Sequence, residues 1–189
     1  MNNKASTVMQ IEGFLASDDK CLLLSGTNFD EKHKIVMSII NKLYDNKLVL
    51  FRAPHISHIH NDGILGWVGI NEKNRKNLLN GKRMKIGSNI YECDDMYHPS
   101  SWHKTSRSFF CAIIMLGNRH DRKQMESIEN VLKDKNAEKV FLVTNFSSIE
   151  NDLLSLGKFI SRHVIYDAED ESPEKHARVL ELQKQSVNY

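Results

Sequence analysis

The feature that most constrains this sequence is an alternation of short, uniformly apolar segments with amphipathic helical ones. "KCLLLSG" at 20–26 and "KLVLFRAP" at 47–54 are apolar at almost every position, as strands covered on both faces are. Residues 30–46 between them carry an apolar stripe at helical spacing, made of Ile35, Val36, Ile39, Ile40 and Leu43. Strand, helix and strand in this order predict parallel strands joined by right-handed crossovers.

The same alternation returns in the second half of the chain. Apolar strands are predicted at 108–116, 139–145 and 163–168, and helices at 121–136 and 147–161. The whole pattern predicts an α/β fold with three layers, in which a mostly parallel five-stranded sheet carries helices on both faces. We expect a single domain over 1–189, with an irregular insertion at 55–107 after the second strand. The insertion contains a predicted hairpin around Gly87.

Single residues mark the ends of three predicted elements, namely the first helix, the second strand and the last helix. An N-terminal helix is predicted at 5–17, with Ser6 as its N-cap, because Ser caps helices well. Pro54 is expected to stop the second strand, since proline lacks the N–H that a ladder needs. A last helix begins near Pro173, which suits a first helical turn.

Composition narrows the class of protein. The apolar share of 40% and the net charge of +2 are ordinary for a soluble globular domain. The cysteines at 21, 93 and 111 have no CxxC spacing, which favours a reducing compartment. No apolar run has the length of a membrane span or of a signal peptide core. We therefore expect a cytoplasmic protein that has no membrane partner.

The loop after the first strand, "SGTNFDEKHK", has the layout of a phosphate-binding loop. Against G-x-x-x-x-G-K-[ST], Gly26 and Lys32 match, whereas Glu31 replaces the second glycine and His33 the hydroxyl residue. This part of the chain resembles the P-loop NTPase family with a degenerate Walker A motif, although no specific family within it is identified. The resemblance implies that ATP or GTP phosphates would meet Gly26, Thr27, Asn28, Lys32 and His33.

The same resemblance predicts little hydrolysis. In the family, a later apolar strand ends in an acid that holds the metal, but 108–116 is followed by Gly117 and Asn118, and its first acid is Asp121. Glu31 brings a negative charge to the loop, and a neutral imidazole at 33 is a poor ligand for Mg²⁺. Asp167 is the only acid at a strand end. We expect a domain that acts mainly by binding, without efficient NTP hydrolysis.

A second candidate site is a cluster of histidines and acids in the insertion. "PHISHIHND" brings His55, His58, His60 and Asp62 within eight residues, and imidazoles with a carboxylate suit Zn²⁺, Mn²⁺ or Fe²⁺. A second group of potential ligands follows at Glu92, Asp94, Asp95, His98 and His103. Together they suggest, as an alternative function, a metal-dependent phosphoesterase or nuclease. The cysteines are expected to be structural.

The insertion is also basic. The stretch 73–85 contains six lysines and arginines and no acid, and aromatic residues flank it. The basic residues are Lys73, Arg75, Lys76, Lys82, Arg83 and Lys85. Such clusters suit a nucleic acid backbone, although ordinary solvated hairpins carry them as well. The partner expected here is a nucleic acid or a protein. A third interpretation of the chain is a non-catalytic subunit of a larger complex, with the insertion as its docking surface.

Overall fold

The computed structural model describes residues 2–28, 30–55, 81–117, 121–144 and 149–186. The strands in this part are β1 (Cys21–Ser25), β2 (Leu48–Ala53), β3 (Met84–Ile86), β4 (Asn89–Asp95), β5 (Phe109–Met115), β6 (Ala137–Val143) and β7 (Arg162–Ile165). The helices are α1 (Lys4–Leu15), α2 (Lys32–Leu43), α5 (Pro99–Trp102), α6 (Arg122–Lys133), α7 (Ile149–Leu156) and α8 (Pro173–Ser186).

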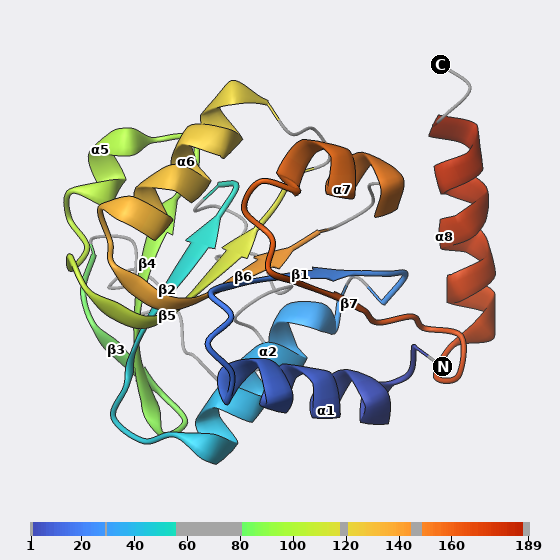
Figure 1. The fold of residues 1–189 in the computed structure, drawn as a ribbon, viewed down its shortest axis with the longest axis horizontal. Coiled ribbons are helices and arrows are strands. Elements are labelled where there is room, and N and C mark those ends of the chain that lie inside the picture. Colours follow the sequence, from blue (N-terminus) through green and yellow to red (C-terminus); the bar gives the residue numbers. More distant parts are fainter. Residues whose placement is uncertain (1, 29, 56–80, 118–120, 145–148, 187–189) are drawn as a thin grey trace.

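One sheet of seven strands runs through the described part, in the order β3-β4-β2-β5-β6-β1-β7 (Figure 1). All neighbouring pairs are parallel except β3 and β4, which form an antiparallel hairpin. The predicted mostly parallel α/β sheet is confirmed, but the predicted number of five strands is wrong. The two added strands come from 81–95, where the hairpin expected around Gly87 joins the main sheet beside β2.

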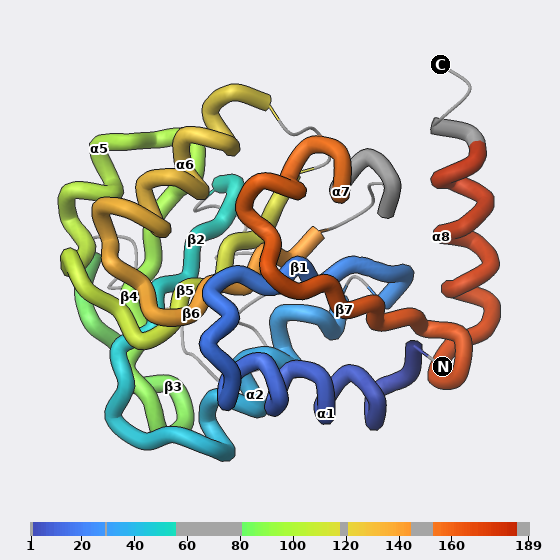
Figure 2. Tube along the Cα trace, in the orientation of Figure 1, coloured from blue at the N-terminus to red at the C-terminus, as the bar shows by residue number. Residues whose placement is uncertain are grey.

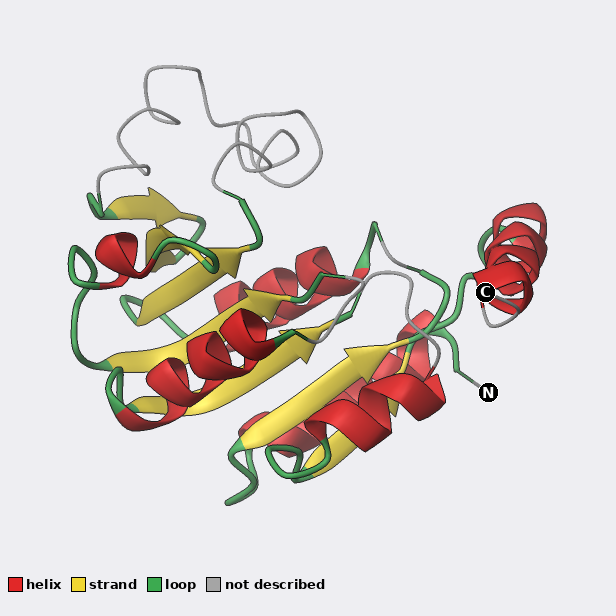
Figure 3. Ribbon diagram, turned by 90° about the horizontal axis from the view of Figure 1, so that it is seen from above, coloured by secondary structure: helices red, strands yellow, loops and turns green. Residues whose placement is uncertain are grey.

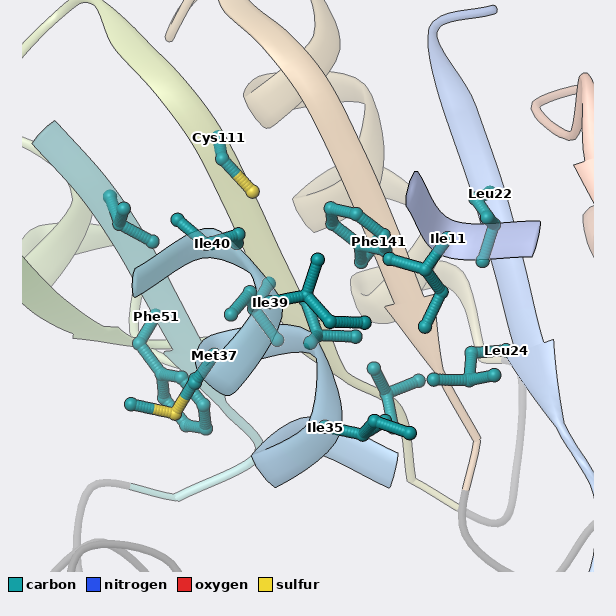
Figure 4. Packing of buried hydrophobic residues seen from close by; sticks show 14 of the residues in the cluster. Ile11, Leu22, Leu24, Ile35, Met37, Ile39, Ile40, Phe51, Cys111 and Phe141 are labelled. Atoms are coloured by element: carbon teal, nitrogen blue, oxygen red, sulfur yellow. The ribbon is translucent and has the colours of Figure 1, made fainter. Parts of the chain in front are cut away.

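Helices cover both faces of the sheet, as expected (Figure 3). The described core forms two hydrophobic clusters, one on each face of the sheet. Leu22 and Leu24 of β1 belong to the first cluster, and Leu23 between them belongs to the second. The first cluster takes in α1 and α2, and the second takes in α6 and α7. Side chains of α2 pack directly onto the strands, with Ile39 and Ile40 turned toward the sheet (Figure 4).

The ends of several elements follow local chemistry. β2 ends at Ala53, just before Pro54, as predicted. The predicted N-cap of α1 is wrong by three residues: Asn3 caps the helix, and its side chain accepts a hydrogen bond from the N–H of Ser6. Asn caps helices about as well as Ser. Leu43, at the end of the predicted α2 stripe, is 43% exposed.

The last helix stands beside the body of the domain. α8 lies apart from the two helical layers, and its first turn comes close to the start of the described chain (Figure 2). Asp167 joins these regions, since its N–H donates to the carbonyl oxygen of Asn2 and its Oδ2 accepts from the Asn2 amide at 3.0 Å. None of the helices that the structure describes is both long and apolar enough to cross a bilayer.

Candidate functional site

The topology of the sheet marks one crevice at its carboxyl edge. β1 and β6 are neighbours, yet α2 follows β1 on one face and α7 follows β6 on the other. Ligands in open parallel sheets bind where neighbouring connections leave toward opposite faces. The loop from Gly26 to His33 begins at this point. The fold therefore places the predicted phosphate-binding loop where such a sheet offers a ligand site.

Gly26 starts the loop in a conformation that other residues rarely adopt. Its φ is +107°, and a β-carbon there would lie 2.4 Å from the carbonyl oxygen of Tyr166. The next two residues are tied to the same stretch of chain. The N–H of Thr27 donates to Asp167 Oδ1 at 3.0 Å, and the N–H of Asn28 donates to the carbonyl oxygen of Tyr166. The chain just after β7 thus shapes the first half of the loop.

The start of α8 and the chain just before it also contact the loop. The Thr27 hydroxyl lies 2.7 Å from His176 Nδ1, and the Asn28 amide donates to Glu171 Oε2 at 3.1 Å. Lys175 reaches Asp30 Oδ2 at 2.6 Å. Asp167, singled out by the sequence as a strand-end acid, is engaged in holding the loop and the N-terminal segment. Its role in the structure is that of an anchor.

The lysine of the loop is inside the protein. Lys32 is fully buried, and its Nζ donates to the carbonyl oxygen of Gly26 at 2.7 Å, across the loop. It is the first residue of α2, whose N-cap Glu31 makes no side-chain capping bond. The Glu31 carboxylate instead pairs with Lys34 at 2.6 Å. The first N–H groups of α2 therefore have no cap from this side chain, as at helix ends that receive anions.

His33 is the least expected residue of the loop. Its side chain is buried, its ring lies edge-on to Phe51 at 6.3 Å, and neither ring nitrogen has a partner among the described residues. Burial lowers the pKa of His33 to about 4, and the neighbouring Lys34 contributes to the lowering, so the ring is neutral at pH 7. Buried polar groups without partners are rare and call for an explanation.

The end of β5 offers no metal-binding acid among the described residues. Leu116 and Gly117 follow the strand, and the N–H of Gly117 donates to Gln124 Oε1 at 2.9 Å. Asp121 caps α6 by accepting from the N–H of Gln124. At the end of β6, Thr144 is buried and its N–H donates to the carbonyl oxygen of Leu24. In the resembled family the strand at the place of β5 ends in an acid that holds the metal, whereas β5 is followed by Leu116 and Gly117.

The histidine and acid cluster is only partly inside the described region. His58, His60 and Asp62 lie outside it. The structure brings His55 to two members of the second group, Asp95 and His98, with one potential ligand atom of each residue within 4.8 Å of the others. The sequence pattern had placed His55 with His58, His60 and Asp62, and had joined this group to the second one as a candidate phosphoesterase site. The signal that joins His55 to Asp95 is the pairing of β2 with β4, which the sequence pattern did not reveal.

The other acids of the second group are committed elsewhere. Asp94 is fully buried and forms a two-pronged ion pair with Arg52, at 2.7 Å and 2.6 Å. Glu92 accepts from Arg83 Nε and from the N–H and hydroxyl of Ser106. Both were predicted as potential metal ligands, and in this structure both serve as buried partners of arginines. His103 is exposed and is not part of the cluster.

The basic stretch is described only from residue 81 onward, so Lys73, Arg75 and Lys76 lie outside it. Lys82 and Lys85 are exposed at the β3 hairpin. Arg83 donates to Glu92 and to the Ser106 hydroxyl, which leaves fewer of its donors for a phosphate backbone. Nucleic acid binding by this stretch remains a prediction, as does a role of the chain as a subunit of a larger complex.

All three cysteines are buried and unpaired, as expected for structural thiols. Burial raises the pKa of Cys21 to about 12, and it raises the pKa values of Cys93 and Cys111 as well. For Cys93, the charges of Asp94 and Glu92 add to this effect. A thiol is nucleophilic only as the thiolate, so none of these cysteines is suited to covalent catalysis.

Comparisons with known proteins support the fold. No protein family and no curated protein matches the sequence. Among solved structures, the chain is similar to the large terminase of a thermophilic bacteriophage, with a TM-score of 0.54, 8% identity, and 96% of this chain covered. The same terminase in complex with ADP matches with a TM-score of 0.53 and 9% identity, again over 96% of this chain. The chain spans about half of these terminases, 49% and 48%.

A further similarity, to the Legionella pneumophila ATPase DotB, has a TM-score of 0.43 at 13% identity and covers 84% of this chain and 40% of DotB. At sequence identities this low, a structural similarity shows the fold of the chain and says nothing of its chemistry. The terminase structures support a P-loop NTPase-like α/β fold, in agreement with the resemblance seen in the loop sequence.

Proposed function

We propose that the loop from Gly26 to His33 binds the phosphate groups of a nucleotide, ATP or GTP, and that the chain acts by binding, without efficient hydrolysis. The observation that carries this proposal is the position of Lys32. A buried ammonium group folded over the loop onto the Gly26 carbonyl, at the start of a helix, supplies positive charge where phosphate would lie.

The substitution of the second glycine by Glu31 is compatible with this proposal. A carboxylate in the loop would repel phosphate, but Glu31 forms an ion pair with Lys34 at 2.6 Å, and this pairing offsets its charge. His33 is neutral and so brings no charge to the loop, and its two ring nitrogens are buried without a partner among the described residues. The terminase solved with ADP has a similar fold, which makes a nucleotide the first ligand to test.

Weak hydrolysis is inferred from the metal side of the site. Mg²⁺ is usually held by a hydroxyl and a strand-end carboxylate beside the phosphates. His33 replaces the hydroxyl residue, and Leu116 and Gly117 follow β5 in place of an acid. The acid nearest in sequence, Asp121, caps α6. Among the residues that the structure describes, the phosphates would thus have charge and hydrogen bonds but few ligands for the metal.

The test is titration calorimetry of the full chain with ATP and GTP, each with and without Mg²⁺. Lys32→Met keeps an apolar stem in the buried position and removes the charge, so it should weaken binding by at least about tenfold. Lys42→Met is the matched control, because Lys42 belongs to the same helix and its side chain is 71% exposed. Binding that is equal in all three proteins, or no binding at millimolar nucleotide, would refute the proposal.

Hydrolysis is measured separately, as phosphate release under conditions in which binding is saturated. Turnover near one per second would contradict the inference of a binding domain, since that rate lies at the lower end of typical enzymes. Binding with no release above background would support it.

A further inference from the structure

Three potential metal ligands meet at the carboxyl ends of β2 and β4, away from the phosphate loop. His55, Asp95 and His98 each offer one ligand atom, and these atoms all lie within 4.8 Å of one another. Asp95 is 6% exposed, whereas both histidines are exposed. A largely buried acid flanked by two accessible imidazoles is an arrangement that a metal ion can enter from solvent.

The sheet explains why residues far apart in the sequence converge. β2 and β4 are parallel neighbours, and their register pairs Ala53 with Asp95. The two strands therefore end at the same level of the carboxyl edge. His55 follows shortly after Ala53, the last paired residue of β2. Asp95 is the partner of Ala53 in the register, so the pairing of the two strands brings the side chains of His55 and Asp95 together.

A tight turn places His98 on the same carboxylate. Asp95 Oδ1 accepts from the N–H of Tyr97 at 2.9 Å, which makes an Asx-turn, and it lies 3.0 Å from His98 Nδ1. The backbone of Asp95 is fixed as well, because its carbonyl oxygen accepts from Trp102 Nε1 at 2.7 Å and its N–H donates to the Ser101 hydroxyl. The acid and one histidine are thus held in place before any ligand arrives.

The second histidine packs on the turn itself. The ring of His55 lies 5.5 Å from that of Tyr97 and 6.5 Å from that of His98, centre to centre. These contacts keep the two imidazoles near one another across the two strand ends. In proteins, such fixed ligands bind a metal with less loss of conformational freedom than ligands on separate mobile segments.

We propose that His55, Asp95 and His98 bind one divalent transition metal ion, with Zn²⁺ as the ion that the ligand set fits best. Two imidazole nitrogens and one carboxylate oxygen are a common zinc ligand set, and they also accept Mn²⁺ or Fe²⁺. The His98 side chain is 66% exposed, so coordination positions on the solvent side stay open to water or to an anionic ligand. Such an open position is typical of zinc sites that bind substrates.

This site is distinct from the nucleotide site. β1, which leads into the phosphate loop, is three strands away from β2 in the sheet. At about 4.8 Å per strand, the two sites lie on the order of 14 Å apart along the edge. An ion at His55, Asp95 and His98 is therefore too far from the loop to serve as the Mg²⁺ of a bound nucleotide. Metal binding here stands whether or not the loop binds phosphate.

The experiment uses the full chain, stripped of metal with a chelator and then titrated. Co²⁺ gives a visible absorption band that reports the ligand geometry, and Zn²⁺ is measured by its displacement of Co²⁺. We expect one ion per chain. Asp95→Asn preserves the acceptor of the Asx-turn, so it tests the charge of the carboxylate with the turn intact. His55→Gln and His98→Gln remove the two imidazoles.

Each of the three substitutions should weaken metal binding by at least about tenfold. His103→Gln is the matched control, an exposed histidine shortly after His98, and it should leave the affinity unchanged. Lys32→Met should also leave it unchanged, which separates this proposal from nucleotide binding. No uptake at millimolar metal, or uptake that all three ligand variants retain, would overturn the proposal.

Discussion

Gly26 and Tyr166 are in backbone contact where β1 and β7 end. A β-carbon on Gly26 would lie 2.4 Å from the Tyr166 carbonyl oxygen and 2.8 Å from its nitrogen. The glycine that opens the phosphate loop is therefore required by the neighbouring strand, as well as by its φ of +107°. One position serves both the packing of β7 and the path of the loop.

Gly26→Ala should destabilise the protein by at least about 2 kcal/mol, because alanine would be strained at this φ and would clash with backbone that cannot turn aside. The measurement is the free energy of unfolding from urea titration. Gly13→Ala is the control. Gly13 lies inside α1, and a β-carbon there would meet only Arg162 Nη1 at 3.6 Å. That variant should gain about 0.5–1 kcal/mol; equal effects at the two positions would contradict the assignment.

Arg52 is the buried cation that holds β4 to the rest of the domain. Besides the pair with Asp94, its guanidinium donates to the carbonyl oxygen of Ser127 at 2.8 Å and lies 4.5 Å from the ring centre of Trp102. Asp94→Asn removes the balancing charge while keeping the shape. It should cost about 3–5 kcal/mol, the usual cost of breaking one side of a buried ion pair.

The control for this prediction is an ion pair on the surface. Arg122 and Glu126 are one helical turn apart in α6 and largely exposed, so Glu126→Gln should change the free energy of unfolding by less than about 0.5 kcal/mol. Chemical denaturation of both variants, side by side, measures the difference. A loss below about 1 kcal/mol in Asp94→Asn would show that Arg52 finds other partners.

The buried pair also explains which parts of the fold the sequence could predict. Strands such as β1 and β5 are apolar at nearly every position, so the residues themselves reveal that both faces are covered. β4 reads "NIYECDD", with three acids among seven residues, yet it is an inner strand of the sheet. Two of these acids, Asp94 and Glu92, pair with Arg52 and Arg83, and the pairing of Arg52 with Asp94 across 42 residues leaves no signal in a local pattern.

The two candidate sites differ in the same way, because one is local in the sequence and the other depends on strand pairing. The phosphate loop is continuous in sequence, so the spacing from Gly26 to Lys32 could be recognised before the structure. The cluster of His55 with Asp95 depends on the register between β2 and β4, which local periodicity does not fix. The contacts of the loop with Asp167 and His176 also come from segments 140 or more residues away. Local motifs could be predicted, and long-range partners could not.

Lys139 secures the carboxyl end of α1 on the sheet. Its Nζ donates to the carbonyl oxygens of Phe14, Ser17 and Asp19 and lies 4.9 Å from the centre of the Phe14 ring. Lys139→Met keeps the stem but leaves these carbonyl groups without their donor, and it should cost about 1–3 kcal/mol. Thermal and urea unfolding measure the loss. Lys133→Met, at a 73% exposed side chain, is the control and should have little effect.

His33 should make the stability of the protein depend on pH. Its pKa falls from 6.5 in the unfolded chain to about 4 in the folded protein, because burial disfavours the charged ring. Between these two values the unfolded state binds more protons than the folded state. The free energy of unfolding should therefore be highest above pH 6.5 and decrease as the pH falls toward 4, by up to about 3 kcal/mol from this residue.

The measurement is urea unfolding at pH values from about 4 to 8, in wild type and in His33→Leu. Leucine cannot take up a proton, so the variant should lose the part of the pH dependence that belongs to His33. At pH 7 it should also be more stable than wild type by about 1–3 kcal/mol, since it removes a buried imidazole whose nitrogens have no partner among the described residues. His103→Gln, at an exposed position, should follow the wild-type curve. Parallel curves for wild type and His33→Leu would show that the imidazole is hydrated or paired, and the phosphate loop would then lose its buried neutral histidine.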